Sequence, residues 1–325
     1  MDPVPWREAW HTALYAAGRG FYVTRGGPAA HFTTATHGVT GAVLAEALLR
    51  LWSRRHRGGP PAVVVDVGAG RGELATHVAD LLGARAGVVA VDVVDRPEGL
   101  DPRIEWVRAA GGALLPDALE GLSGALVVAH EWLDVVPCTV AGVDDRGQLR
   151  EVLVDPATGD EHLGGGLSGE DLDWVTAHWP DARPGERVEV GRARDAAWAE
   201  LVGRVESGVL VAVDYGHLAA DRPRSGTLVG YRSGTLVPPV PDGSCDVTAH
   251  VAMDSLWADG LASQRDLLRD LGLRGERPDH ALAQSDPLAY LRALERASAE
   301  AELIRPGGLG DFWWAVKHVG AADVP

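Results

Sequence analysis

The glycine-rich segment Asp66-Val67-Gly68-Ala69-Gly70-Arg71-Gly72 supports most of what the sequence says about the fold. It follows a β-branched run from Ala62 to Val67. After it come apolar residues at helical spacing, namely Leu74, Val78, Leu81 and Leu82. A continuous apolar run bounded by glycine is typical of a parallel strand that is buried on both faces. The sequence therefore predicts a strand, a tight turn and a helix in direct succession.

Other apolar segments extend this pattern along the chain. Strands are predicted at 88–94, 104–107, 126–129, 209–213 and 312–316. Helical spacing occurs at 40–52, near Leu267 to Leu271, and at 287–304. Strands that alternate with helices predict an α/β protein with a Rossmann-like core, built on a doubly wound and mostly parallel sheet.

Segment 138–185 interrupts the alternation of strands and helices. It contains a predicted β-hairpin from Thr139 to Val154, which turns at residues 144–147, and a predicted glycine-rich loop at 164–166. We interpret this segment as an insertion that could cover the active site. The region 216–246 is rich in glycine and proline and is predicted to loop over the carboxyl ends of the strands.

The composition limits the expected partners and compartment. A net charge of −16 argues against nucleic acid, because phosphate backbones are bound by clustered Lys and Arg. Lys317 is the single lysine, which excludes a Walker-type phosphate loop. Cys138 and Cys245 are too few for a disulfide framework. Without a secretory start or a bilayer-length apolar run, the sequence favours a cytoplasmic protein with no membrane partner, in which a homodimer is possible.

The glycine-rich turn is suited to a negatively charged ligand, because backbone N–H groups and a helix N-terminus meet there. Asp92 follows Gly72 by twenty residues, at the end of the next predicted strand. A carboxylate in that place can accept hydrogen bonds from ribose hydroxyls. The pattern reads G-x-G-x-G, with Glu73 where dinucleotide-binding loops carry a third glycine. The alternative is a tight strand–helix turn that binds no ligand.

Several motifs together resemble the MidA family of methyltransferases, which includes the mitochondrial complex I assembly arginine methyltransferase. They follow one another in order from about residue 10 to residue 273. In this sequence they are Ala13-Leu14-Tyr15, Gly20-Phe21-Tyr22, His31-Phe32-Thr33-Thr34-Ala35, Asp66 to Gly72, His130-Glu131-Trp132-Leu133-Asp134-Val135-Val136-Pro137, Val213-Asp214-Tyr215-Gly216-His217, Thr227-Leu228-Val229-Gly230-Tyr231-Arg232 and Asp246-Val247-Thr248-Ala249-His250-Val251.

The resemblance implies S-adenosylmethionine as cofactor and methyl transfer to a nitrogen, with protein arginine as the acceptor type. The residues expected to bind the cofactor are Asp66, Gly68, Ala69, Gly70, Gly72, Asp92 and Val93. We divide the chain into an N-terminal helical lid (1–61), a first part of the cofactor-binding core (62–137), the insertion (138–185) and a second part of the core (186–325).

Acidic residues at the ends of two predicted strands are candidates for handling the acceptor. Glu131 and Asp134 follow one strand and Asp214 follows another, so paired carboxylates could clamp a guanidinium, which is always protonated. His130 is a further catalytic candidate. Alternatively, Glu131 binds the adenosine side and Asp214 caps a strand end. The residues expected to bind the substrate are His31, Phe32, Thr34, Tyr215 and His217.

Histidines replace acidic or amide residues of the family pattern at His31, His37 and His130. One explanation is neutral drift. Another is a changed substrate with a neutral nucleophile, such as a hydroxyl or an amine, for which a histidine acts as general base. A metal site formed by the three is a third interpretation. If the acids are lost, a small molecule or peptide becomes the alternative acceptor. Three tryptophans could stack on a ring or fill the core: Trp132, Trp313 and Trp314.

Two further classes of function compete with a methyltransferase. A non-catalytic assembly factor would keep the fold and lose turnover, and the histidine replacements motivate this alternative. A nucleotide-dependent oxidoreductase is motivated by the glycine-rich loop alone and requires binding of NAD.

Overall fold

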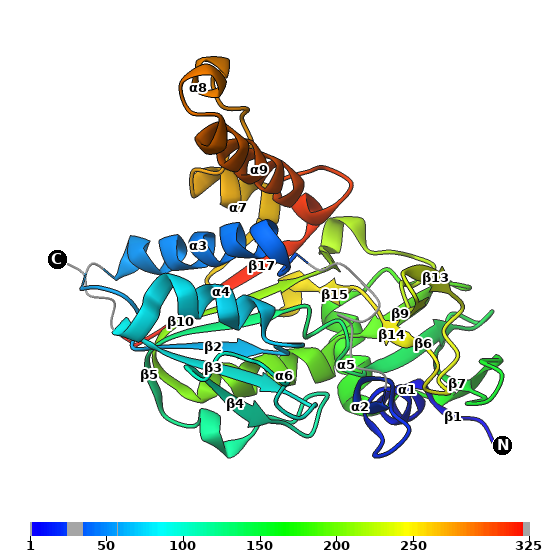
Figure 1. Cartoon of the computed structure of the whole chain (residues 1–325). Helices are drawn as coiled ribbons and strands as arrows, with labels where there is room; N and C mark the ends of the chain where they lie inside the picture. Colours follow the sequence, from blue (N-terminus) through cyan, green and yellow to red (C-terminus); the bar gives the residue numbers. More distant parts are fainter. Residues whose placement is uncertain (1, 25–34, 57, 321–325) are drawn as a thin grey trace.

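A central sheet organises the protein, for which a computed structural model describes residues 2–24, 35–56 and 58–320 (Figure 1). Within these residues it has seven strands in the order β16-β17-β10-β5-β2-β3-β4. Their bounds are β2 Val63–Val67, β3 Gly87–Asp92, β4 Ile104–Arg108, β5 Leu122–His130, β10 Val205–Asp214, β16 Gly260–Ser263 and β17 Trp313–Val319. Strands β10, β5, β2, β3 and β4 are parallel, whereas β17 and β16 join antiparallel. The α/β prediction is confirmed, with a sheet that is mixed at one edge.

The central strands are mostly apolar because helices cover both faces of the sheet (Figure 1). In β2, Val64 belongs to a core with α3 (Gly38–Arg55) and α4 (Glu73–Leu82). The next residue, Val65, belongs to the opposite core, with α6 (Arg192–Gly203). Alternate residues of a strand point to opposite faces, so neighbouring valines are buried in different cores. Helices α3 and α4 were predicted from their apolar spacing, whereas α6 was not, and the strands named by the apolar runs lie where those runs are.

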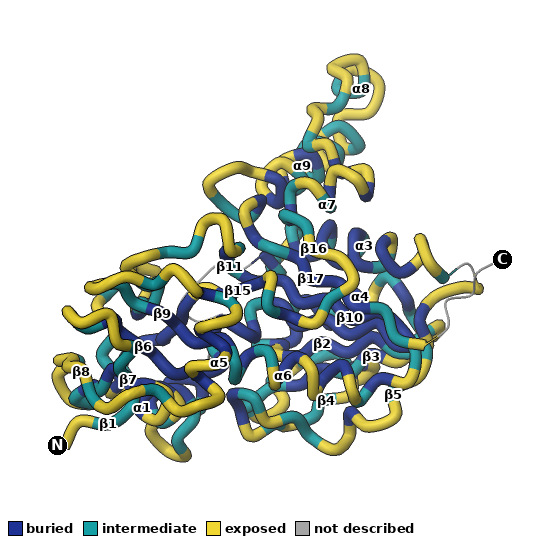
Figure 2. The backbone as a smooth tube through the Cα atoms, turned by 180° about the vertical axis from the view of Figure 1, so that it is seen from behind, coloured by how far each residue is buried: buried dark blue, intermediate teal, exposed yellow. Residues whose placement is uncertain are grey.

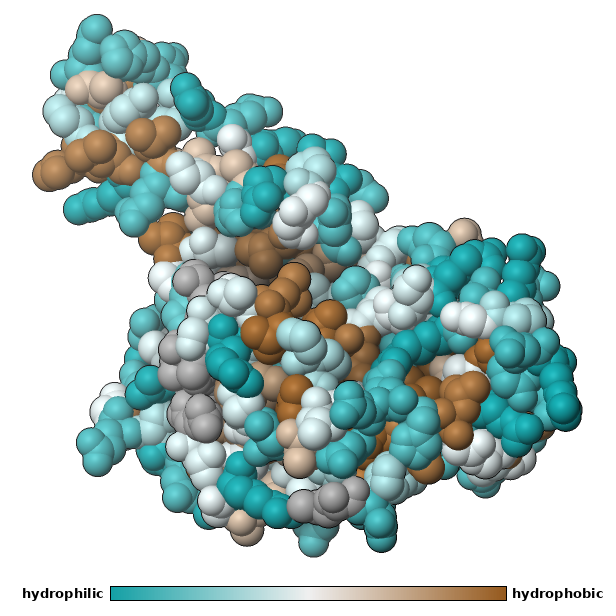
Figure 3. All heavy atoms as spheres, turned by 90° about the vertical axis from the view of Figure 1, so that its right-hand side faces the viewer, coloured by the Kyte–Doolittle hydropathy of each residue, from teal (hydrophilic) through white to brown (hydrophobic). Residues whose placement is uncertain are grey.

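A helical arm extends from the α3 side of the sheet (Figures 1 and 2). It contains α7 (Gln264–Asp270), α8 (His280–Ser285) and α9 (Pro287–Leu303), and it ends in the short helix η6 (Leu309–Asp311). The tip of the arm is mostly exposed (Figure 2). Apolar side chains are visible on the arm and on the body beneath it (Figure 3), and Leu288 and Leu291 are among the exposed apolar residues.

A second sheet lies beyond the carboxyl ends of the central strands (Figure 1). Its order is β1-β7-β6-β9, and β8 pairs with β7. The bounds are β1 Val4–Pro5, β6 Thr139–Val143, β7 Leu149–Val154, β8 Glu161–Gly166 and β9 Arg187–Val190. Helix α1 (Trp6–Tyr15) packs with Val140, and α5 (Gly169–His178) packs with the neighbouring Ala141. The two helices therefore cover opposite faces of this sheet.

The structure confirms one prediction for segment 138–185 and corrects another. Strands β6 and β7 form the predicted hairpin, and the N–H of Gly147 donates to the carbonyl of Asp144 at the turn, at 2.8 Å. The predicted loop at 164–166 is instead the end of β8. Glycine marks loops in sequence, but backbone hydrogen bonds to β7 require no side chain. The division of the chain at 61, 137 and 185 stays a prediction.

Short elements cover the carboxyl ends of the central strands. The region 216–246 was predicted as loops, and it contains small strands in addition. The three-stranded sheet β13-β12-β14 comprises Thr235–Val237, Val229–Arg232 and Asp246–Thr248, and β11 (Gly216–His217) pairs with β15 (Val251–Ala252). The remaining short helices are α2 Phe21–Thr24, η2 Gly83–Arg85, η3 Asp117–Leu119, η4 Ala219–Asp221 and η5 Met253–Ser255. No helix in the described ranges combines the length and apolarity that crossing a membrane requires.

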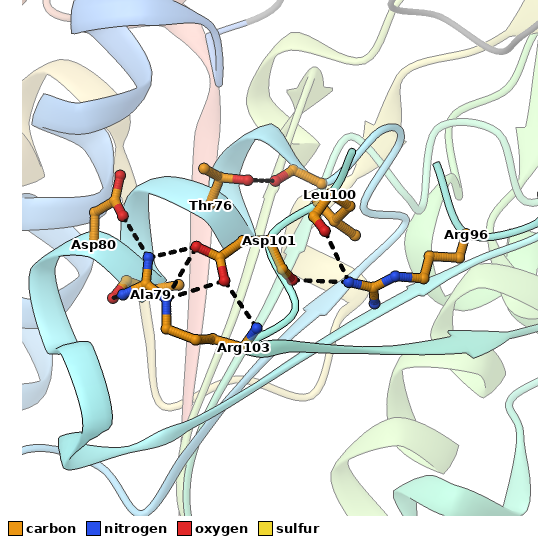
Figure 4. Close-up of polar contacts among 8 residues, drawn as sticks. Thr76, Ala79, Asp80, Arg96, Leu100, Asp101 and Arg103 are labelled. Carbon is orange, nitrogen blue, oxygen red and sulfur yellow. Dashed lines mark hydrogen bonds and ion pairs between the residues drawn. The ribbon is translucent and has the colours of Figure 1, made fainter. Parts of the chain in front are cut away.

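Polar contacts fix the loop between β3 and β4 (Figure 4). Arg103 donates to Asp101 in the loop and to Asp80 on α4, the latter at 2.7 Å. Arg96 donates to the carbonyls of Leu100 and Asp101 at 3.0 and 2.8 Å. Because this loop begins directly after Asp92, its anchoring holds the end of β3 in place.

Candidate functional site

The glycine-rich turn joins β2 to α4 and is held by hydrogen bonds to β3. The N–H groups of Gly68 and Ala69 donate to the carbonyl of Val91 at 2.9 and 3.0 Å. The N–H of Gly70 donates to Oδ2 of Asp92 at 2.8 Å. Gly72 precedes α4 with a φ of 83°, and a Cβ there would lie 2.8 Å from Leu100. Asp92 ends the next strand, as predicted, and lies beside the glycine-rich turn.

Two adjoining cavities lie at this edge of the central sheet. The large cavity has a volume of about 230 Å³ and the small cavity about 80 Å³. Both are lined by Tyr22, Gly68, Gly70, Glu131 and Val135, so they are two parts of one cleft. Segment 138–185, which was expected to cover the site, contributes no residue to either lining.

Most of the predicted cofactor-binding residues line this cleft. Asp66 and Ala69 face the large cavity, and Asp92 and Val93 face the small cavity. Gly72 lines neither, and its surroundings are those of a residue that shapes the turn. Burial raises the pKa of Asp66 to about 7 and the pKa of Asp92 to about 6, although the Gly70 N–H opposes the latter shift.

The small cavity has a largely apolar lining, to which Asp92 and Glu131 add two acidic side chains. Val93, Leu115 and Trp132 are among its walls. Trp132 also lies against Gly68: a Cβ added to Gly68 would be 3.4 Å from the Cβ of Trp132. By contrast Trp314 is buried in the core, and its indole N–H donates to Gln264 at 2.9 Å. Of these two tryptophans, Trp132 is the one placed to contact a ligand.

The turn after β5 places Glu131 between two side chains that hold its carboxylate. Tyr215 donates its hydroxyl to Oε2 at 2.9 Å, and His130 Nδ1 lies 3.3 Å from Oε1. All three residues line the large cavity. Burial raises the pKa of Glu131, but the contacts with His130 and Tyr215 outweigh burial and lower it overall. Glu131 has a positive φ of 53°, which is unusual for a residue with a side chain and frequent at functional sites.

Asp134 and Asp214 occupy different positions around this turn. Asp134 lines the large cavity and accepts the Thr248 hydroxyl at 2.6 Å. Asp214 is fully buried, lines neither cavity, and accepts the N–H groups of Leu133 and Asp134 at 3.0 and 3.1 Å. Burial raises the pKa of both carboxyls. The catalytic role of Asp214 stays a prediction, and its contacts are those of a residue that positions the turn.

The buried Arg194 supports the same turn from α6. Its guanidinium donates to the backbone carbonyls of Asp134, Val136 and His250, at 2.8 to 3.1 Å. These carbonyls belong to the loops after β5 and β14. Arg194 thus connects the turn after β5, which carries Asp134, with the segment that follows the cavity residue Thr248.

Several cavity residues had no assigned role in the sequence analysis. Asp246 and Thr248 of β14, Tyr22 of α2 and Tyr231 of β12 line the large cavity. Tyr22 donates its hydroxyl to Asp246 at 2.8 Å, and burial raises the pKa of Asp246 to about 7. The signal that could have found them is the motif Asp246-Val247-Thr248, which carried the resemblance without a stated function.

The predicted substrate-binding residues have different outcomes. Tyr215 lines the large cavity, as stated above. His217 is buried outside both cavities, where Arg222 lies 2.9 Å from its Nδ1, and burial and Arg222 lower its pKa to about 3. His31, Phe32 and Thr34 lie outside the described residues. Among the described residues no group of three or more His, Cys, Asp or Glu is arranged to hold a metal ion, and His37 lies 3.5 Å from Glu73.

Comparisons with known proteins identify a family and a shared fold. A family model described as "Putative S-adenosyl-L-methionine-dependent methyltransferase" matches residues 43–267. A COG1565 superfamily member from Burkholderia thailandensis, solved with S-adenosyl-homocysteine bound, is 24% identical, with a TM-score of 0.74 over 99% of this chain and 90% of that one. A second structure of that superfamily from the same organism is 24% identical, with a TM-score of 0.75 over 98% and 89%. The two structures show the shared fold. No curated protein matches the sequence.

The raised pKa of Asp246 predicts a pH dependence of stability. Its carboxyl keeps its proton up to about pH 7 in the folded state but to about pH 4 when unfolded, so the folded state binds more protons between these values. Its contribution to the free energy of unfolding is therefore present at low pH and is lost as the pH rises. The free energy of unfolding of wild type should therefore fall relative to that of Asp246→Asn as the pH rises from about 5 to about 8. The difference between the two proteins should change by about 1 to 3 kcal/mol in favour of the variant.

Urea denaturation at both pH values measures this difference. Asp145→Asn, at an exposed turn position, is the matched control and should follow wild type. Parallel pH profiles for Asp246→Asn and wild type would contradict the placement of a protonated Asp246 in the folded cleft.

Proposed function

The chain belongs to the S-adenosyl-L-methionine-dependent methyltransferase family matched above, and from this premise we propose that it methylates a nitrogen of a positively charged acceptor. The observation that carries the proposal is the lining of the large cavity. Three carboxyl groups line it: those of Asp134 and Asp246 are buried, and that of Glu131 is partly buried. Buried carboxylates are costly without a cation, so a cationic acceptor stabilises their ionised forms.

The cofactor fits the side of the cleft that the glycine-rich turn and the small cavity form. The apolar walls around Val93 and Trp132 suit an adenine ring. Asp92 can accept ribose hydroxyls with the lone pairs left after its bonds to Gly70 and Val94. The N-terminal end of α4 suits the carboxylate of the methionine part. The cofactor supplies an activated methyl group on sulfur when it is bound here.

The acceptor nitrogen would enter the large cavity, where Glu131 and Asp134 can bind its N–H groups. Methyl transfer from sulfur is an in-line displacement, so the chief contribution of these residues is to orient the nitrogen toward the methyl group. A guanidinium is planar, always charged and matched to carboxylate pairs. This supports the acceptor that the MidA resemblance implies, an arginine side chain of a protein.

The experiments described below also distinguish other acceptors and other functions. A small molecule or a peptide with a charged nitrogen would use the same carboxyl groups. A non-catalytic assembly factor would bind S-adenosylmethionine without transferring its methyl group. An NAD-dependent oxidoreductase is disfavoured by Glu73, which stands where the dinucleotide loop carries its third glycine.

Gly70→Val should abolish binding of S-adenosylhomocysteine. At Gly70, which has a φ of 60°, a Cβ would contact Glu73 Oε2 at 3.7 Å and otherwise extend into open space on the cavity side. The valine would occupy the space assigned to the ligand. Isothermal titration measures the affinity, with NAD as the ligand control.

Gly83→Val is the matched control for Gly70→Val. Gly83 lies at the other end of α4, also has a positive φ of 58°, and has open space around its Cβ position. Both variants place a β-branched residue at a positive φ, which strains the backbone at either position, but only Gly70 lines the cleft. Unchanged affinity in a folded Gly70→Val variant, or equal loss in both, would place the cofactor elsewhere.

Asp134→Asn should reduce methyl transfer to an arginine-containing peptide, with little effect on the affinity for S-adenosylhomocysteine. Loss of a charge-assisted hydrogen bond of about 1.5 to 3 kcal/mol lowers kcat/KM roughly tenfold to a hundredfold. Radioactive methyl groups from S-adenosylmethionine report the transfer, and Asp145→Asn should behave as wild type. Transfer at the wild-type rate would remove Asp134 from the acceptor site, and transfer to neutral acceptors alone would contradict a cationic acceptor.

A further inference from the structure

The large cavity contains buried polar atoms whose hydrogen-bonding capacity is unused. Within the described part of the chain, three atoms on its wall have no hydrogen-bond partner: Asp66 Oδ2, His130 Nε2 and Asp134 Oδ1. Buried polar groups are normally paired, so an unpaired group on a cavity wall indicates a ligand contact. Of these three atoms, His130 Nε2 is the nitrogen, and the His130 side chain is only 4% exposed.

The other nitrogen of this ring determines what Nε2 can do. His130 Nδ1 lies 3.3 Å from Glu131 Oε1, and Glu131 Oε2 accepts the Tyr215 hydroxyl. An ionised carboxylate only accepts hydrogen bonds, so Nδ1 must carry the proton that joins the two side chains. In a neutral imidazole one nitrogen donates and the other accepts. His130 Nε2 is then an unprotonated acceptor on the cavity wall.

The surroundings hold the ring in this orientation. His130 ends β5, and the N–H of Glu131 donates to the carbonyl of Val213 on β10 at 2.8 Å. The Phe312 ring, which precedes β17, packs 6.0 Å from the imidazole. The positive φ of Glu131 turns the chain so that its carboxylate returns to the preceding residue. The His130–Glu131 pair is therefore positioned before any acceptor binds.

Two titratable groups face the ring. Glu131 faces Nδ1, and Asp66 at the end of β2 lies close enough to interact with the ring electrostatically. Burial raises the pKa of Asp66 to about 7. With a pKa of about 7, Asp66 is about half protonated at neutral pH, so on average it carries only part of a negative charge near the ring. Phe312 on the third side carries no charge.

We propose that Nε2 of His130 is the general base that receives the proton released by the acceptor nitrogen on methylation. This inference rests on the proposed function. The nitrogen forms a bond to the methyl carbon, the carbon–sulfur bond breaks with its electron pair going to sulfur, and one N–H proton moves to Nε2. The resulting imidazolium lies beside the Glu131 carboxylate, which stabilises its charge.

The proposal restricts the class of acceptor. A nitrogen that carries at least one hydrogen releases a proton on methylation, as a guanidinium, a primary amine or a secondary amine does. A tertiary amine has no N–H proton to release, so its methylation would need no general base. The acceptor is thus an N–H compound, and its N–H faces the end of β5.

The first test is the protonation state of His130, which needs no acceptor. Nitrogen-15 NMR on histidine-labelled protein with S-adenosylhomocysteine should show a neutral ring at about pH 7.5, protonated at Nδ1 and unprotonated at Nε2. The resonances are assigned by their loss in His130→Asn. In Glu131→Gln the preference for this tautomer should weaken. A proton on Nε2, or a doubly protonated ring up to about pH 9, would overturn the proposal.

The second test follows methyl transfer to an arginine-containing peptide. His130→Asn and His130→Gln should keep the affinity for S-adenosylhomocysteine and lose about a hundredfold in kcat. The acidic limb of the pH profile should disappear with them. His162→Asn, on exposed β8, is the matched control and should be unchanged. Wild-type turnover in both His130 variants, or a parallel loss of cofactor affinity, would overturn the base role.

The two tests keep the two proposals apart. If wild type binds S-adenosylhomocysteine but methylates no arginine peptide, the proposed acceptor fails and the NMR result alone decides on His130. If wild type does not bind S-adenosylhomocysteine, the placement of the cofactor fails. If the peptide is methylated while Nε2 carries a proton, the base role fails and the proposed function stands.

Discussion

The carboxylate of Asp214 holds together the two strand ends on which the site depends. It ends β10, is fully buried, and accepts N–H groups from the turn after the neighbouring strand β5. A buried carboxylate without partners is costly, so this turn cannot move away from β10 without a large loss of stability. Glu131 begins the turn and Asp134 lies within it. The geometry of both cavity acids therefore depends on a residue that does not reach the cavity.

The cleft joins two different environments. Around Asp92 the walls are apolar, which suits a flat ring with a polar edge. Around Glu131, Asp134 and Asp246 the walls are acidic and carry tyrosine hydroxyls. Burial raises the pKa of Asp134 to about 6 and the pKa of Asp246 to about 7, and a cation would favour their ionised forms. The apolar part of the cleft thus suits a neutral aromatic group, and the acidic part suits a charged nitrogen.

The sequence predicts the strand–turn–helix unit because its signals are local: β-branched residues, glycines and helical spacing lie within twenty residues. It does not predict the pairing of Tyr22 with Asp246, since these residues are 224 positions apart and no periodicity connects them. Asp214 was expected to face the ligand because it follows a strand, and His217 was expected to bind the substrate. Side-chain direction instead turns Asp214 toward the neighbouring turn and His217 toward Arg222. Strand ends can be located from sequence, whereas side-chain direction there requires the structure.

A crystal structure of the protein with S-adenosylhomocysteine would show whether one cleft holds the cofactor and presents its sulfur to the acidic cavity. We expect adenine between Val93 and Trp132, ribose hydroxyls on Asp92, and the sulfur at the border of the two cavities near Glu131. Ligand density outside this cleft, or an adenine ring within the acidic cavity, would contradict this placement of the cofactor.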